Sequence, residues 1–93
     1  MQYGRHTEVF VDGDTEVERT VYMKGGKQMR VEREIFEERR KVNNQLEEAA
    51  EYNNFARQYH TDPTMRDPSI RIEGKDAKQG YYYVVLTYTR FIE

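Results

Sequence analysis

The carboxyl-terminal segment, residues 81–92, constrains the fold more than any other part of the chain. It reads Tyr-Tyr-Tyr-Val-Val-Leu-Thr-Tyr-Thr-Arg-Phe-Ile, a run of β-branched and aromatic residues without Gly or Pro. Such residues fit the pleated, half-buried surface of a strand. The even positions are Tyr82, Val84, Leu86, Tyr88, Arg90 and Ile92, and the odd positions are Tyr81, Tyr83, Val85, Thr87, Thr89 and Phe91. Because alternate residues of a strand point to opposite sides, the two sets belong to two faces of one sheet.

Apolar side chains occur on both faces of this expected strand. The even positions form the better core face, but the odd positions still present Tyr81, Tyr83, Val85 and Phe91. An antiparallel strand with one face in water normally alternates between apolar and polar residues. We therefore expect a cover over part of the odd face, either from a second copy of the chain, joined sheet to sheet or by helix exchange, or from the chain's own first 24 residues. An open patch that takes a foreign ligand is the third alternative.

Shorter strands are expected in the amino-terminal third of the chain. Residues 7–11 (Thr-Glu-Val-Phe-Val) read as one strand, and residues 15–24 alternate in the manner of a second. Asp12-Gly13-Asp14 between them is a turn signal, because Gly and Asp tolerate the backbone angles of tight reversals. Gly25-Gly26 then predicts a hairpin that leads into a third strand.

The register of this second hairpin is predicted from its faces. A two-residue loop would mix apolar and polar residues on each face of the hairpin. A three-residue loop, Gly25-Gly26-Lys27, sets Met23 opposite Met29. It also sets Val21 opposite Val31. Because a slip of one residue turns every side chain to the other face, the three-residue loop is the prediction.

Residues 33–60 are predicted to form one long helix. They contain no Gly or Pro and are rich in Glu, Arg, Gln and Ala, which are good helix formers. Apolar residues recur at helical spacing at Ile35, Val42, Leu46, Ala49, Ala56 and Tyr59. The stripe is widened by Phe36, Ala50, Tyr52 and Phe55. At about 1.5 Å per residue this helix would be roughly 40 Å long, against a radius of gyration of ~13 Å for a domain near 100 residues. It would project beyond its own sheet or lie against a partner's, with Asn53 as a place for a break.

Two prolines mark the end of this helix. Thr61-Asp62-Pro63 and Asp67-Pro68 predict a connector, because the residue before a proline is pushed toward extended backbone. Residues 69–73 then alternate as a strand, with Ile70 and Ile72 on the face that pairs with the even positions of the last strand. The sequence thus predicts an α+β fold, in which an antiparallel sheet with the chain order β-β-β-α-β-β packs on one long helix.

Length and composition indicate a single small domain. The chain has 93 residues, which allows one domain over residues 1–93. Its net charge is only −2 and it contains eight Tyr, whereas disorder combines high net charge with few aromatic residues. The absence of Cys excludes disulfides and Cys-based zinc sites and favours a cytoplasmic location. No apolar run approaches the length of a membrane span, so no membrane partner is expected.

Groups that could carry chemistry are sparse. The one serine, Ser69, lacks the glycine context of a nucleophile elbow. His60 followed by Asp62 could act as an oriented base, but a histidine that interacts with the dipole of a helix end explains it more simply. The carboxylates and histidines match no metal-binding spacing. We therefore expect no catalytic residue, no metal site and no cofactor, and hence no enzyme.

Two surfaces are candidates for binding. The first is the odd face of the last strand, with Tyr81, Tyr83, Val85 and Phe91. The second is the tip of the Gly25-Gly26 hairpin, with Lys24, Lys27 and Arg30. A basic hairpin tip could meet a phosphate or an acidic protein surface, although lysines also discourage pairing at strand edges.

A binding role therefore fits the sequence best. We expect a small regulatory protein, of the kind that viruses encode, that contacts itself as a homodimer and another protein, as an inhibitor or accessory factor of a larger complex. The alternative is the binding of single-stranded nucleic acid or of a nucleotide. Bases would then stack on Tyr81 and Tyr83, while Arg71, Arg90, Lys75 or Lys78 contact phosphates.

Overall fold

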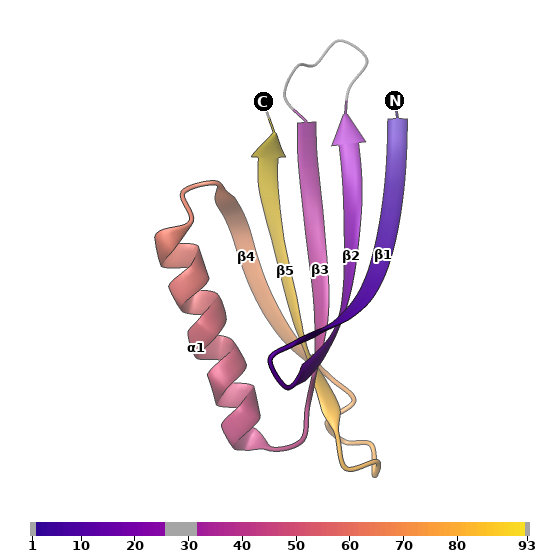
Figure 1. The fold of residues 1–93 in the computed structure, drawn as a ribbon, viewed down its shortest axis with the longest axis vertical. Coiled ribbons are helices and arrows are strands. Elements are labelled where there is room, and N and C mark those ends of the chain that lie inside the picture. Colours follow the sequence, from indigo (N-terminus) through magenta and orange to yellow (C-terminus); the bar gives the residue numbers. More distant parts are fainter. Residues whose placement is uncertain (1, 26–31, 93) are drawn as a thin grey trace.

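The computed structural model of the chain describes residues 2–25 and 32–92. In this described part the elements are β1 (Gln2–Asp12), β2 (Thr15–Gly25), β3 (Glu32–Val42), α1 (Gln45–Thr61), β4 (Met65–Glu73) and β5 (Tyr82–Ile92). The strands form one sheet in the order β1-β2-β3-β5-β4, and all neighbours are antiparallel (Figure 1). The predicted α+β class, with one helix after three strands and two strands after the helix, is confirmed.

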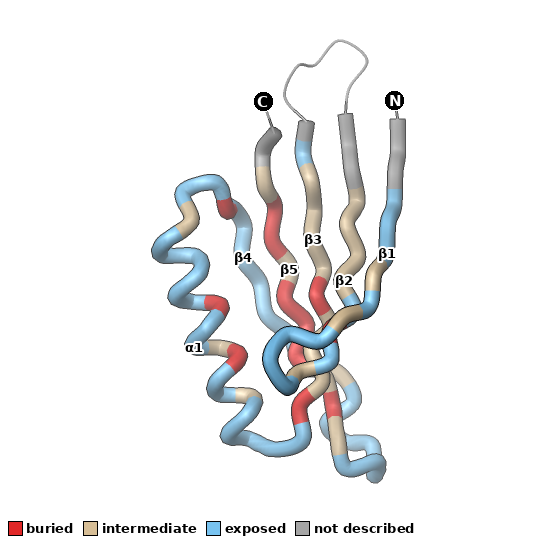
Figure 2. Tube along the Cα trace, viewed as in Figure 1, coloured by how far each residue is buried: buried red, intermediate tan, exposed pale blue. Residues whose placement is uncertain are grey.

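The core lies between α1 and one half of the sheet. The elements that α1 contacts are β3, β4 and β5. The buried cluster consists of Val42, Phe55, Met65, Tyr82, Val84, Leu86 and Tyr88. Four of these are even positions of β5, which confirms the predicted core face of that strand. Figure 2 shows buried stretches along β5. The molecule is elongated, with extents of 48 × 25 × 22 Å, because the strands run on past the helix (Figure 1).

The third strand replaces the first part of the predicted helix. Residues 32–42 form β3, between β2 and β5, so the predicted helix over 33–60 is wrong before residue 45. The face of β3 that meets α1 carries Glu38 and Arg40, which neutralise one another at 2.8 Å. Since charged residues stand where a strand normally carries apolar ones, the alternation that signals a strand is hidden. Pairing on both edges then outweighs a local preference for helix.

Helix α1 is set by a cap rather than by an apolar stripe. The Asn44 side chain accepts a hydrogen bond of 2.9 Å from the Glu47 amide, and the Glu47 carboxylate accepts one of 3.0 Å from the Asn43 amide. This reciprocal arrangement is a variant of the capping box, and it starts the helix at Gln45. The helix ends before Pro63, as predicted, and it is continuous through Asn53, without the break considered there.

The apolar stripe predicted for the helix is confirmed only in part. Phe55 is buried and Tyr52 packs against the core, whereas Leu46 is 81% exposed. The other buried helix residue is Glu51, which is not apolar. The amino-terminal part of the predicted stripe belongs to β3 rather than to α1.

Strand β4 begins four residues earlier than predicted. It starts at Met65, and the expected connector Asp67-Pro68 is an irregularity in its pairing with β5, between Arg66 and Ser69. Asp67 has a φ of 54°, a left-handed conformation that Asp tolerates better than most residues. A proline is accepted there because β4 is an edge strand. Beyond it, Ile70 and Ile72 face Leu86 and Val84 as predicted.

The first hairpin is confirmed and the register of the second is corrected. Asp12 pairs with Thr15 around a two-residue loop in which Gly13 has a φ of 65°. This conformation suits glycine at the first loop position of a II′ turn. Between β2 and β3, Met23 stands opposite Glu34 and Val21 opposite Phe36, so the predicted pairings with Met29 and Val31 are wrong. The predicted loop residues Gly26 and Lys27, together with Met29 and Val31, lie outside the described residues.

Candidate binding face of the sheet

The sheet has one face that points away from α1, which we call the outer face. It is formed by the odd-numbered residues of β1, β3 and β5 and the even-numbered residues of β2, since these stand opposite one another in the register. Arg71 and Glu73 of β4 extend it to the other edge. Because α1 is the one helix of the described part and packs on the opposite face, the outer face lacks a helical cover (Figure 1).

Of the two candidate binding surfaces, the odd face of the last strand belongs to the outer face. The tip of the Gly25-Gly26 hairpin falls outside the described residues. Tyr83 and Val85 lie on β5, and Tyr81 directly precedes that strand. The rings of Tyr81 and Tyr83 meet edge to face, with centroids 5.9 Å apart. Lys27 and Arg30 lie outside the described residues, as do the side chains of Lys24 and Phe91.

Cations from β3 cover the two tyrosine rings. The Arg39 guanidinium lies 4.5 Å from the centroid of the Tyr83 ring, and the Lys41 ammonium lies 4.3 Å from that of Tyr81. Such contacts contribute about 0.5–1 kcal/mol each at exposed sites. They follow directly from the sheet register, which sets Lys41 opposite Tyr83 and Arg39 opposite Val85. The aromatic rings are therefore partly occupied by the protein's own charges.

Carboxylates on neighbouring strands complete a network of alternating charge. Arg71 donates to Glu37 and to Glu73, each at 3.0 Å, and Arg39 lies 3.4 Å from Glu73. The two carboxylates raise the pKa of Arg71, mainly through these hydrogen bonds. Since the pairs are exposed, each contributes little to the free energy of unfolding, about 0–1 kcal/mol.

Val85 shows how this network replaces the expected cover. It is on the outer face, yet its exposed fraction is 0%. In the register it stands between Arg39 on β3 and Arg71 on β4. The aliphatic stems of such long side chains can cover an apolar neighbour on the same face. Val85 is therefore covered within its own chain and does not need a second copy as a cover. Tyr81 and Tyr83 are half-buried within their own chain.

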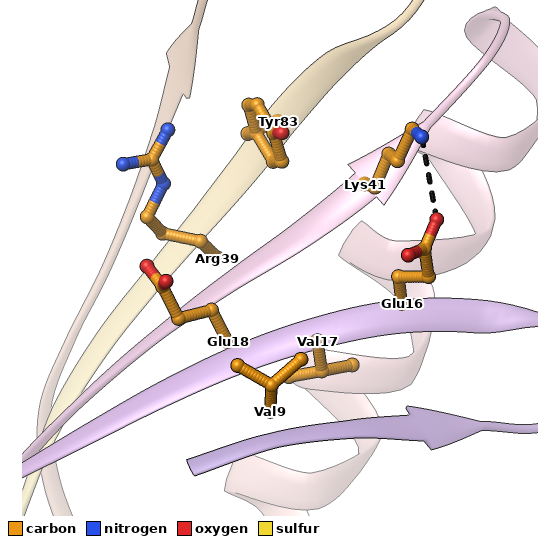
Figure 3. Close-up of a pocket in the computed structure, with 7 residues that line it drawn as sticks. All are labelled: Val9, Glu16, Val17, Glu18, Arg39, Lys41 and Tyr83. Carbon is orange, nitrogen blue, oxygen red and sulfur yellow. Dashed lines mark hydrogen bonds and ion pairs between the residues drawn. The ribbon is translucent and has the colours of Figure 1, made fainter. Parts of the chain in front are cut away.

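A hollow of about 270 Å³ opens on the outer face beside these residues. It is lined by Val9, Glu16, Val17, Glu18, Arg39, Lys41 and Tyr83 (Figure 3). Lys41 is paired with Glu16 at 3.3 Å on one side, and Arg39 and Glu18 lie on the other (Figure 3). The hollow thus offers a ring, an apolar wall and charges of both signs. Next to it, Val9 is 73% and Val11 is 65% exposed.

A second charged cluster lies on the opposite side, under α1. Arg40 donates to Glu38, Glu51 and Asp12, and Tyr88 donates to Glu38 at 2.7 Å. A cavity of about 230 Å³ adjoins it. Each of these residues is hydrogen-bonded to at least one other member of the cluster. The cluster therefore joins the helix to the sheet, and none of the five side chains lacks a partner.

His60 and Asp62, which were considered as an oriented base, have separate surroundings in the fold. His60 borders a hollow of about 380 Å³ that is otherwise lined by Phe55, Ala56, Tyr59, Pro68, Ser69 and Ile70. Asp62 is engaged instead by Thr64, at 2.6 Å, and by Arg90, at 2.5 Å. The hydrogen bonds from Thr64, and to a lesser degree the positive charge of Arg90, lower the pKa of Asp62. Among the described residues, no three His, Asp or Glu side chains form a group that could hold a metal ion.

Sequence reasoning missed the residues that shape the hollow. Arg39 and Lys41 were assigned to a helix, so their position beside Tyr81 and Tyr83 could not be foreseen. The signal was the alternation of β3 itself, in which Ile35, Glu37, Arg39 and Lys41 share one face. Of the four cations expected near the tyrosines, Arg71 is on the outer face, whereas Lys75 lies over Tyr82 and Arg90 over Phe36 and Tyr88.

Comparisons with protein-family models, with curated proteins and with solved structures found no match for this chain. The helix in the described part of the chain is too short and too polar to cross a membrane. The fold and the outer face are thus the basis on which function is argued.

Proposed function

We propose that this chain is a small, non-enzymatic binding protein that regulates a larger complex through protein–protein contacts and that acts as a homodimer. The observation that carries the proposal is the outer face. It is a broad sheet surface without a helical cover in the described part, and it has a hollow of about 270 Å³ beside the exposed Val9 and Val11. The lack of Cys is consistent with action in the cytoplasm.

The side chains on the outer face have a composition typical of protein–protein interfaces. Interfaces are enriched in tyrosine and arginine and keep polar groups at their rim. Around the hollow, Tyr83 and Arg39 form such a pair, and Glu16, Glu18 and Lys41 supply charges of both signs. A protein surface can complement both signs in fixed positions, which gives specificity more than affinity.

Binding of single-stranded nucleic acid is the second candidate, because Arg39 and Lys41 do lie against Tyr83 and Tyr81. A strand of phosphates would have to displace the carboxylates Glu16 and Glu73 from these cations. A base would have to displace the cations from the rings. These two costs rank this candidate below a protein partner.

The test is a photo-crosslinking experiment in the native host. A benzophenone amino acid replaces Tyr83, where it keeps an aromatic ring in the hollow, and in a matched variant it replaces Ala50, an exposed residue of α1. The proposal expects a discrete protein adduct from position 83 that is absent from position 50 and resists nuclease.

Two results would contradict the proposal. Adducts that disappear with nuclease would favour nucleic acid, and a salt series with a single-stranded oligonucleotide would then show a steep loss of affinity. Identical adducts from positions 83 and 50 would show that the outer face is not a specific surface.

A further inference from the structure

The two edge strands of the sheet, β1 and β4, differ in how well another strand could pair with them. The β4 edge carries Pro68, a break in register between Arg66 and Ser69, and Asp67 in a left-handed conformation. Such features prevent another strand from pairing with an edge. The β1 edge has no proline, and its register with β2 is unbroken from Gln2 to Asp12. One edge is therefore guarded and the other is open.

The open edge also carries exposed apolar side chains. Thr7 is exposed, and Val9 and Val11 are the two most exposed valines of the described part, at 73% and 65%. All three are on the outer face. A long, regular edge strand with exposed β-branched residues is a template for pairing with another strand.

The hairpin fixes which backbone groups of β1 are free. In a two-residue hairpin the pair that flanks the loop, here Asp12 and Thr15, is hydrogen-bonded, and bonded and non-bonded pairs alternate from there. The odd-numbered residues of β1 therefore direct their amide and carbonyl groups toward the open edge. These are the same residues whose side chains lie on the outer face.

We propose that β1 pairs antiparallel with β1 of a second copy of this chain, with the twofold axis at Thr7. The two sheets then join into one of ten strands. This inference rests on the proposed homodimer and names its interface. The contact between the outer face and a different protein does not depend on it.

The charges of β1 select this register. With the axis at Thr7, His6 stands opposite Glu8 of the second copy, and Arg5 stands opposite Val9 of the second copy. An axis at Glu8 would set two glutamates directly opposite, and an axis at Arg5 would set two arginines opposite, which destabilises a strand pair. An axis at Val9 avoids like charges but leaves Gln2 to Arg5 without a partner strand residue. The axis at Thr7 pairs all eleven residues of β1.

Engineered cysteines test the register, because the natural chain has none. Residues opposite each other in a bonded antiparallel pair have Cα atoms about 5.5 Å apart, within the range that a disulfide spans. Single variants Thr7→Cys, Glu8→Cys and Val9→Cys are oxidised gently and compared with Ala56→Cys on α1. We expect the disulfide dimer to form fastest at position 7. Faster formation at 8, 9 or 56 would overturn the register.

A charge swap tests the same pairing without a covalent bond. Val9→Lys places a lysine opposite Arg5 of the second copy and should raise the dimer dissociation constant several-fold. The double variant Arg5→Glu/Val9→Lys makes this pair attractive and should restore the dimer. Failure of the double variant to restore it would contradict the axis at Thr7.

Light scattering on the natural chain decides whether the dimer exists. We expect twice the 11.2 kDa of one chain, falling to one chain in Thr7→Pro. A proline at Thr7 removes an amide that points to the open edge, so the backbone hydrogen bonds to β2 remain, which circular dichroism can verify. The one bond to β2 that it removes is the side-chain bond between the Thr7 and Thr20 hydroxyls, at 3.1 Å on the exposed surface. A natural chain that stays monomeric at high concentration would overturn this inference and the homodimer. The crosslinking result at position 83 would not be affected, because it tests contact with a different protein.

Discussion

Arg40 of β3 and Glu51 of α1 form an ion pair that joins the sheet to the helix. The same guanidinium donates to Glu38 at 2.8 Å and to Asp12, at the end of β1, at 2.7 Å. Burial opposes the charge of Arg40, but the hydrogen bond with Asp12 and the charges of Glu51 and Glu38 outweigh it and raise its pKa. One side chain thus fastens three parts of the fold together.

Replacement of this arginine should destabilise the protein strongly. Arg40→Met leaves the buried Glu38 and Glu51 without their shared counter-ion, which we expect to lower the free energy of unfolding by about 3–5 kcal/mol. Arg39→Met on the outer face is the matched control and should cost no more than about 1 kcal/mol. Urea denaturation of both variants measures the difference. Equal losses would show that the Arg40 cluster does not hold the helix to the sheet.

Alkaline pH should weaken the fold through Tyr82. Its hydroxyl donates to Glu48 at 2.6 Å, and this hydrogen bond, with burial, raises the pKa of Tyr82 from 10.0 to about 12. A pKa raised by folding means that the stabilisation is complete below pH 10 and is lost as the pH rises to about 12. Unfolding measured across this interval should show the loss, and Tyr82→Phe should reduce its slope. An unchanged slope would exclude Tyr82 as its source.

Val85 should behave as a core residue despite its place on the outer face. Val84 and Val85 are both 0% exposed, although Val84 belongs to the core cluster and Val85 is on the outer face opposite Arg39. We expect Val84→Ala and Val85→Ala each to lower the free energy of unfolding by about 2 kcal/mol. Chemical denaturation compares them directly. A negligible effect at Val85 alone would mean that the arginine stems do not shield it from water.

The helix cap gives a prediction that is independent of packing. Asn44→Ala removes the acceptor of the Glu47 amide and should cost about 1 kcal/mol. Asn53→Ala, at an exposed position in the middle of α1, should be neutral or stabilising by up to about 0.7 kcal/mol, because Ala is the better helix former. Thermal unfolding of the two variants separates these effects. A loss at Asn53 equal to that at Asn44 would argue against a capping role.

Several elements could be predicted because their signals are local. Asp12-Gly13-Asp14 makes a turn wherever it stands between two strands, and Pro63 ends a helix through its own ring. The composition of β5 permits little other than a strand, and its even face was correctly assigned to the core. The odd-face residues Tyr83 and Val85 were correctly placed together, though not the cations around them.

The sequence by itself determined the last strand, its core face, the first turn, the end of the helix and the α+β class, because each depends on neighbours in the chain. Only the tertiary structure decided that residues 32–42 form a strand and that Val85 is covered by its own subunit. Residues 33–42 favour a helix locally, and they become a strand through pairing with β2 and β5, which come from distant parts of the chain. The charges of Glu38 and Arg40 become acceptable in a core only when the fold brings Glu51 and Tyr88 to them.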